Sequence, residues 1–241
     1  MEIRGQIALV TGANRGIGRA IVGKLLDAGV TKVYAGARDT GNLADLVARD
    51  HGRIVPLTLD VTDRAGVDAL AAKASDVTLL VNNAGVLDFG GLLEAEETAL
   101  ARNFSTNFFG KLNMARAFAP VIERNGGGAI VNLLTLVALA SMPGLSIYNA
   151  SKAAAWSMTQ SLRASLAARK ISVFGIFPGA VDTDMLKGVE MAKTSPADIA
   201  EAIIAGILAD REDIFPDPMS AQMYTAWKAD HKAVEKQFAA M

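Results

Sequence analysis

Short apolar runs alternate along the chain with longer segments in which apolar residues recur at helical spacing. The short runs are rich in Val, Ile and Leu, which is typical of parallel strands that are buried on both faces. This pattern predicts seven strands, at Ile7–Val10, Lys32–Ala35, Ile54–Leu59, Val77–Val81, Ala129–Leu134, Ile171–Phe177 and Asp213–Phe215.

Between the strands lie the segments with a helical period. They predict helices near Ile17–Ala28, Leu43–Asp50, Arg64–Ala74, Glu96–Ile122, Tyr148–Ala168 and Pro196–Ala209, with a last one from about Ala221 to Ala239. Regular alternation of strand and helix predicts an α/β protein with a doubly wound parallel sheet, flanked by helices on both faces. No repeat or Pro/Ser-rich linker divides the chain, so we expect a single domain over residues 1–241.

One face of the last predicted helix is apolar. It consists of Met219, Met223, Trp227, Val234, Phe238 and Met241. Such a face is expected to pack against the body of the protein or a partner subunit. A role as a cover over a substrate is the alternative.

Composition excludes several classes of function. The chain has 24 basic and 25 acidic side chains and no run of Lys or Arg, so it lacks the charge footprint of a nucleic-acid or anionic-membrane binder. Its most apolar stretch, Ala129–Ala140, is interrupted by Asn132 and Thr135 and is shorter than the ~20 residues of a spanning helix. We therefore expect a small-molecule partner, no nucleic acid and no membrane.

Thiol and metal chemistry also find little support. The chain has no cysteine, which excludes disulfides and thiolate-held metals. Its two histidines, His51 and His231, are far apart in the sequence, so no metal centre is predicted. The first apolar run, Ile7–Val10, is too short for a signal peptide, and we expect a cytoplasmic protein.

A glycine-rich turn directly follows the first predicted strand and reads Thr11-Gly12-Ala13-Asn14-Arg15-Gly16-Ile17-Gly18. Gly12 permits a tight turn, Gly16 lets the backbone approach a pyrophosphate, and Gly18 lets helix and strand pack closely. The free N–H groups of the helix that begins here face the phosphates. The turn therefore predicts a dinucleotide site that includes Asn14, Arg15 and Ile17.

The choice of dinucleotide depends on the end of the second strand. An acidic residue about 20 positions past such a turn commonly binds the ribose 2′-hydroxyl of NAD. Arg38 stands at that place, and Arg15 can reach the same pocket, so two guanidinium groups could clamp a 2′-phosphate. Asp39 could instead accept from a ribose hydroxyl or cap the next turn. We expect NADP(H) to be preferred over NAD(H).

Further motifs follow in order: Asp60-Val61-Thr62, Asn82-Asn83-Ala84-Gly85, Tyr148-Asn149-Ala150-Ser151-Lys152, and Pro178-Gly179 with Val181 and Thr183. With the glycine turn, they closely resemble the short-chain dehydrogenase/reductase family, and in particular bacterial NADPH-dependent carbonyl reductases. The resemblance spans nearly the whole chain and implies a Rossmann-type fold. It implies that Asp60 and Val61 contact the adenine, that Asn82, Ala84 and Gly85 line the cofactor, and that the loop from Pro178 through Gly179 and Val181 to Thr183 binds the nicotinamide carboxamide. It also implies a homo-oligomer, either a dimer or a tetramer.

Tyr148 and Lys152 are the expected catalytic pair. Four residues apart on a helix, they share a face and can both reach the nicotinamide ribose. A nearby ammonium favours the phenolate, so Lys152 is expected to lower the pKa of Tyr148 from its ordinary value of ~10.

Two more residues complete the expected catalytic set. The family's serine lies 13 residues before the tyrosine, and this chain has Thr135 there, which retains the hydroxyl but adds a methyl group. Asn107 matches the asparagine that, in the family, distorts its helix and holds a water linked to the lysine. The alternatives are a β-branched strand end for Thr135 and a locally bonded helix asparagine for Asn107.

The reaction that these residues predict is hydride transfer between NADP(H) and a carbonyl/alcohol pair, with Tyr148 as the proton donor in reduction. Apolar residues near the site favour a hydrophobic ketone or aldehyde: Leu136, Leu139, Met142, Leu145, Met185, Leu186, Val189 and Met191. The main alternative is a catalytically silent NADP(H)-binding regulatory protein, since the site departs from the family at Thr135. An epimerase or dehydratase is a third possibility, although those relatives usually carry a larger substrate domain.

Overall fold

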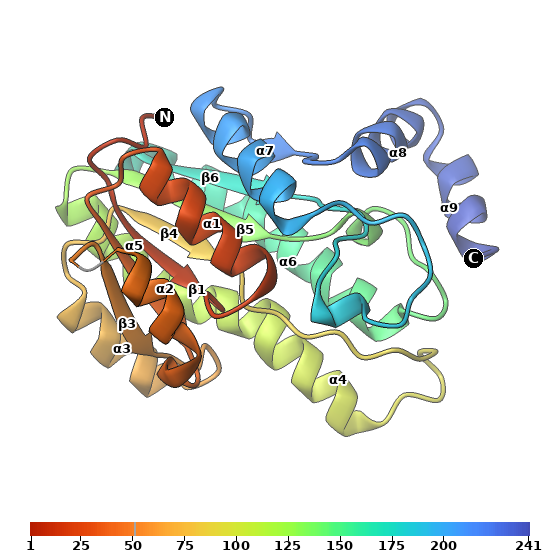
Figure 1. Cartoon of the computed structure of the whole chain (residues 1–241). Coiled ribbons are helices and arrows are strands. Elements are labelled where there is room, and N and C mark those ends of the chain that lie inside the picture. Colours follow the sequence, from red (N-terminus) through yellow and green to blue (C-terminus); the bar gives the residue numbers. More distant parts are fainter. Residues whose placement is uncertain (51) are drawn as a thin grey trace.

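A computed structural model describes residues 1–50 and 52–241, and His51 lies outside the described residues (Figure 1). Strands and helices alternate along most of the chain. The strands are β1 (Ile7–Thr11), β2 (Lys32–Ala37), β3 (Ile54–Thr58), β4 (Leu79–Asn82), β5 (Gly128–Leu133), β6 (Ile171–Ile176) and β7 (Asp213–Ile214). The helices between them are α1 (Gly16–Asp27), α2 (Ala44–Arg49), α3 (Arg64–Lys73), α4 (Glu97–Phe104), α5 (Lys111–Arg124), α6 (Ser146–Leu166) and α7 (Pro196–Leu208).

The strands form one parallel sheet in the order β3-β2-β1-β4-β5-β6-β7. From β1 the chain builds the sheet outward through β2 and β3, then crosses to the other side of β1 to place β4. The carboxyl ends of β1 and β4 therefore flank a point where the direction of winding reverses, and ligands bind at such a point in doubly wound sheets. The predicted fold class is confirmed.

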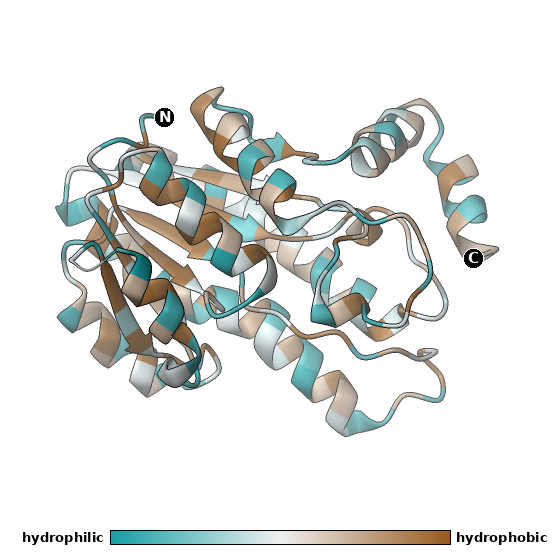
Figure 2. Cartoon of the chain, in the orientation of Figure 1, coloured by the Kyte–Doolittle hydropathy of each residue, from teal (hydrophilic) through white to brown (hydrophobic). Residues whose placement is uncertain are grey.

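Helices cover both faces of the sheet. On one face α1 and α7 pack against each other, and their buried residues share a core cluster with α2 and the strands. On the other face α3 and α5 pack together over a second cluster, which also takes in the end of α6. Figure 2 shows the strands as largely hydrophobic and the helices as mixed, which is the expected pattern for a sheet buried between two helical layers.

The long helix predicted at Glu96–Ile122 is helical from Glu97 to Arg124, but one of its turns is widened. A π-helical turn, η2 (Ser105–Gly110), separates α4 from α5. The irregularity coincides with the buried Asn107, whose Oδ1 accepts from the Val86 N–H at 3.0 Å and whose Nδ2 donates to the Val86 carbonyl at 2.9 Å. π-turns of this kind occur frequently at functional sites.

The prediction of a single C-terminal helix from Ala221 to Ala239 is wrong, because the chain forms two helices there, α8 (Pro218–Ala229) and α9 (His231–Ala239). Asp230 separates them with extended backbone angles, and its side chain accepts from the N–H groups of Lys232 and Ala233. An N-cap aspartate begins a new helix in this way. Apolar residues recur at helical spacing on both sides of Asp230, so the sequence pattern did not reveal the break.

The apolar face of α8 and α9 packs on the segment that follows β5. Val234 and Phe238 are buried against Leu136 and Ala140, which confirms packing against the body of the chain. Aromatic rings hold α8 from the other side, since Tyr224 stacks on Phe215 at 3.9 Å between centroids. The two tryptophans of the chain meet at the same contact, where the ring of Trp227 in α8 lies 6.0 Å from that of Trp156 in α6.

Candidate active site

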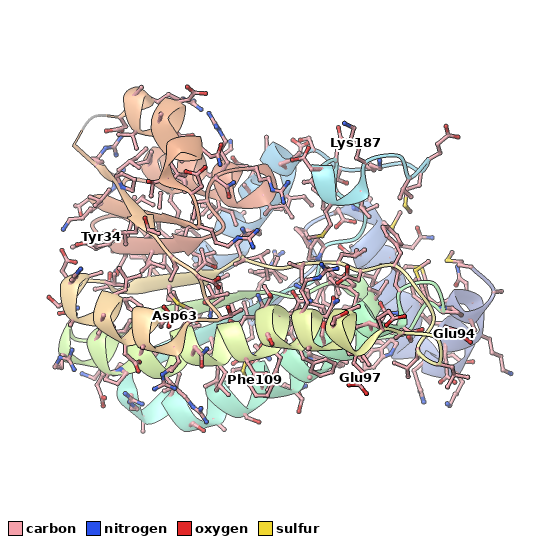
Figure 3. The ribbon with its side chains drawn as sticks, turned by 90° about the horizontal axis from the view of Figure 1, so that it is seen from below. Tyr34, Asp63, Glu94, Glu97, Phe109 and Lys187 are labelled. Carbon is pink, nitrogen blue, oxygen red and sulfur yellow. The ribbon has the colours of Figure 1, made fainter. Side chains whose placement is uncertain are left out.

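One large cavity, with a volume of about 1450 Å³, opens at the carboxyl ends of the central strands. Figure 3 shows that this end carries Glu97 of α4 and Lys187 of the segment after β6, away from Tyr34 in β2. Most of the predicted site residues line the cavity: Gly12, Asn14, Arg15, Gly16, Ile17, Arg38, Asp60, Val61, Ala84, Gly85, Thr135, Tyr148, Lys152, Pro178, Gly179, Val181 and Thr183. Gly18, Asn82 and Asn107 lie behind its wall.

The glycine turn runs from the end of β1 into the first turn of α1, as expected. Gly12 has a φ of +65°, which glycine adopts without strain. A Cβ at Gly18 would lie 2.2 Å from the Gly12 carbonyl oxygen, so only glycine lets α1 approach the strand this closely. Gly16 and Ile17 at the start of α1 line the cavity, and a helix N-terminus reached through glycines fits the pyrophosphate of a dinucleotide.

Of the residues expected to select the dinucleotide, Asp39 is bonded within a turn, whereas Arg38 is exposed at the cavity. Asp39 is used by the turn η1 (Thr40–Leu43), because its carboxylate accepts from Gly41 N at 2.9 Å and from Asn42 Nδ2 at 3.1 Å. Arg38 is exposed at the cavity wall. The pKa of Asp60 is lowered chiefly by its hydrogen bonds from Thr62, and the positive charge of Arg38 adds to this effect.

Arg15 makes an ion pair that the sequence did not predict. Its Nη1 lies 3.1 Å from Oδ2 of Asp184, in the turn η5 (Asp184–Leu186) after β6. The pair connects the glycine turn to the loop expected at the nicotinamide. Both side chains are about two-thirds exposed, so this ion pair contributes little stability.

The segment after β4 is anchored by Thr11 at the end of β1. Thr11 Oγ1 accepts from the N–H groups of Asn83 and Ala84 at 3.0 and 2.9 Å, while Asn83 Nδ2 donates back to the carbonyls of Thr11 and Gly12. Asn83 lines the cavity, as do Ala84 and Gly85 of the expected segment. Asn82 is 1% exposed and donates instead to Asn132 in β5. The alternation of strand faces could have distinguished the two asparagines.

The helix α6 carries Tyr148 and Lys152 on one face, and both side chains are buried. The Lys152 ammonium lies 5.5 Å from the centroid of the Tyr148 ring and donates to the carbonyl of Leu133 at 2.9 Å. That carbonyl is at the end of β5, two residues before Thr135. One helix and one strand end therefore bring the predicted catalytic pair and the threonine together.

Burial determines the protonation of this pair. It raises the pKa of Tyr148 to about 12, and a hydrogen bond with Thr135 acts in the opposite direction. Burial also lowers the pKa of Lys152 from 10.5 to about 7. The direction for Tyr148 is opposite to the one expected from a neighbouring ammonium, because low polarity disfavours both the phenolate and the charged amine.

Thr135 lies two residues after the end of β5 and lines the cavity. The hydroxyl accepts from Val137 N at 3.4 Å and lies 3.5 Å from the Pro178 carbonyl. Asn107 is fully buried, and besides Val86 it donates to Ser151 Oγ at 2.9 Å. Ser151 sits between Tyr148 and Lys152 in sequence, so the asparagine is tied to the helix of the catalytic pair.

The loop after β6 has an anchor that the sequence analysis did not identify. The N–H of Gly179 donates to Oδ2 of Asp217 at 2.8 Å, and Asp217 also caps α8 by accepting from Ser220 N. An aspartate followed by proline is recognisable as a helix start. Its second contact depends on tertiary structure and leaves no local signal.

Comparison with known proteins now defines the family. Residues 6–194 match the short chain dehydrogenase family. An uncharacterized oxidoreductase of Staphylococcus haemolyticus is 35% identical over 212 residues, which cover 84% of this chain and 91% of that protein. The chain therefore belongs to the short-chain dehydrogenase/reductase family and is an oxidoreductase of that family.

Solved structures agree with this assignment. A short chain dehydrogenase from Burkholderia cenocepacia, in complex with NADP, has a TM-score of 0.93 and 36% identity, with 99% of each chain covered. A short chain dehydrogenase/reductase from Burkholderia phymatum, in complex with NAD, has a TM-score of 0.86 and 28% identity, with 98% of this chain and 96% of that chain covered. Structural neighbours thus bind either dinucleotide, and likeness to them does not decide the cofactor preference.

The described residues contain neither a membrane-spanning helix nor a cluster of metal ligands. None of the helices within residues 1–50 and 52–241 is long and apolar enough to cross a membrane. Over the same residues, no group of three or more His, Cys, Asp or Glu side chains is placed to hold a metal ion.

The lowered pKa of Lys152 predicts a pH-dependent stability. Between about pH 7 and 10.5 the folded chain carries Lys152 as a neutral amine, whereas the unfolded chain carries it protonated. The unfolded state then binds more protons, so the free energy of unfolding rises with pH, by up to about 1.4 kcal/mol per pH unit. Urea denaturation of the wild type and of Lys152→Met across this range should show a shallower rise in the variant. Equal slopes would contradict the prediction.

Proposed function

We propose that the protein is an NADPH-dependent reductase of hydrophobic ketones or aldehydes, acting with the whole chain as one domain. The observation that carries this proposal is the meeting of three groups at one end of the dinucleotide cleft: the Tyr148 phenol, the Lys152 amine and the Thr135 hydroxyl. When bound, the reduced nicotinamide supplies a hydride to the carbonyl carbon. The residues of the chain supply the proton, the orientation and the exclusion of water.

Tyr148 is the proton donor in this scheme. Its raised pKa keeps the phenol protonated at neutral pH, which suits reduction, where the carbonyl oxygen takes the phenolic proton as the hydride arrives at carbon. Thr135 lies beside the phenol and can donate to the same oxygen. Lys152 is placed to hold the nicotinamide ribose and to stabilise the phenolate that remains. Asn107 acts through the backbone of Val86 and through Ser151.

Arg38 supports the preference for NADP(H). It is the basic residue at the cavity wall after β2, where a carboxylate would repel a 2′-phosphate. Asp39, the competing acceptor for a ribose hydroxyl, is already bonded within the turn that follows. Arg15 remains close to the phosphate-binding turn, although it is paired with Asp184.

The remaining part of the cavity is apolar and supports a hydrophobic substrate. Its lining includes Leu87, Phe89, Leu136, Met142, Leu145, Met185, Leu186, Val189, Met191, Met219, Met223, Phe238 and Met241. Leu139, also expected there, packs instead in the hydrophobic clusters around Leu136 and Phe177. Six of these residues are methionines, whose flexible thioethers adapt to substrates of different shape. The C-terminal helices thus pack on the body and also supply part of the substrate wall.

Removal of the phenolic hydroxyl tests the proposed function. Tyr148→Phe should lower kcat for NADPH-dependent ketone reduction by about 100-fold or more, because the oxygen loses its proton donor. NADPH affinity should stay within a few-fold. The loss of reduced-nicotinamide absorbance over a panel of aromatic, aliphatic and keto-ester carbonyls measures the rate, with Tyr34→Phe as the matched control. Wild-type protein that binds NADPH yet reduces no carbonyl would favour the silent regulatory protein.

Thr135 allows a finer comparison in the same assay. Thr135→Ser keeps the hydroxyl and should retain activity, whereas Thr135→Val keeps the shape and should lose it. An undiminished rate in Thr135→Val would remove the hydroxyl from the mechanism.

The cofactor preference depends on Arg38. Arg38→Ala should raise the Kd for NADPH by about 10- to 100-fold, the value of a lost charge-assisted hydrogen bond, and leave the Kd for NADH unchanged. Fluorescence titration with both dinucleotides measures the ratio. Arg49→Ala, an exposed arginine away from the cavity, controls for the change in net charge. An unchanged ratio in Arg38→Ala would contradict the assignment.

A substitution in the part of the cavity wall that α9 supplies should change substrate binding and leave cofactor binding unchanged. Phe238→Leu is expected to raise KM for bulky aromatic ketones by about 10-fold, since a ring that contacts them is lost, and to change KM for small ketones much less. NADPH affinity should stay the same. Gln237→Ala, an exposed neighbour on α9, is the control. Equal changes for large and small ketones would place Phe238 outside the substrate wall.

A further inference from the structure

A second buried lysine lies beside the site and has no place in the scheme above. Lys111 is the first residue of α5, directly after the π-helical turn, and is 2% exposed. Its amine donates to the carbonyl of Asn82 at 3.0 Å and to that of Ala84 at 3.2 Å. It does not line the cavity, so it can act on the reaction only through other residues.

The position of Lys111 completes a clamp that Asn107 begins. The two residues are four apart, and between them they bond both ends of the segment from Asn82 to Val86. The segment contains Ala84 and Gly85, which line the cavity. Its conformation is therefore fixed from behind by side chains of η2 and α5.

Lys111 and Lys152 both lie near the peptide that joins Ala84 to Gly85. Lys111 holds the carbonyl of Ala84, and a Cβ on the next residue, Gly85, would lie 3.7 Å from the Lys152 amine. Among the ion pairs of the described residues, none includes either lysine. A buried lysine without a carboxylate is expensive for a protein to keep, which indicates a specific use for it.

We propose that Lys111 is a positioning residue, which holds the Asn82–Gly85 segment in the conformation that receives the dinucleotide and keeps that segment against Lys152. The inference rests on the proposed function, because it takes this segment as part of the NADP(H) site. The two N–H bonds of the amine hold the carbonyls at the start and near the end of the segment.

The electrostatics agree with this role. Burial, together with the positive charge of Lys152, lowers the pKa of Lys111 well below its ordinary value. The amine has hydrogen atoms for both carbonyls whether it is neutral or protonated, so its role as a donor does not depend on its charge. The side chain thus serves as a hydrogen-bond donor to the backbone.

Three variants of the full-length protein test the inference: Lys111→Met, which removes the donors at similar length, Lys111→Gln, which restores one amide donor, and Lys73→Met, an exposed control on α3. NADPH Kd is measured by fluorescence titration, KM for a ketone at saturating NADPH, and melting by circular dichroism. We expect Lys111→Met to raise NADPH Kd by about 10-fold, with Lys111→Gln between it and the wild type and ketone KM unchanged. Lys73→Met should match the wild type.

The outcomes separate the two levels of the proposal. Wild-type protein that binds neither NADPH nor NADH would overturn the proposed function itself. Wild-type binding with an unchanged NADPH Kd in Lys111→Met would overturn the inference alone. A lower melting temperature with unchanged Kd, or failure of both Lys111→Met and Lys111→Gln to fold, would show a purely structural lysine and would also overturn it.

Discussion

Backbone groups just past the end of β4 are the constraint on which the rest of the site depends. From Asn82 to Val86 the chain leaves the sheet between its buried interior and the cavity, and its polar backbone groups take side-chain partners. Thr11 supplies acceptors from β1, while Asn107 and Lys111 supply bonds from η2 and α5. The π-turn with Asn107, the Thr11 hydroxyl and the Lys111 amine thus all serve to hydrogen-bond this one segment.

The same low polarity determines the chemistry of the neighbouring groups. It favours the neutral phenol at Tyr148 and the neutral amine at Lys152. Neither group therefore becomes charged readily unless a bound ligand brings a polar or charged partner. Reactivity in such a site comes from fixed hydrogen bonds that meet charge as it develops. The long, weak bonds of the Thr135 hydroxyl leave it able to reorient toward a substrate oxygen.

The sequence predicted the succession of strands and helices along the chain well, because local signals determine it. Apolar runs mark the strands, and Gly18 is needed wherever α1 packs so closely on β1. The sequence missed what depends on distant partners: the inward turn of Asn82 toward Asn132, and the hydrogen bond from Gly179 N–H to Asp217. It also missed the local cap at Asp230, because the apolar face continues past it. The sign of the Tyr148 shift was missed because spacing places a lysine nearby but does not show how deeply both groups are buried.

The meeting of Trp156 with Trp227 gives the molecule an optical property. Because the chain has two tryptophans and both lie at the contact between α6 and α8, its indole emission arises almost entirely from the place where the C-terminal helices join the catalytic helix. Light emitted by the indoles therefore reports mainly on the contact between α6 and α8. Undocking of α8 and α9 would register as a spectral shift even while the rest of the sheet stayed folded.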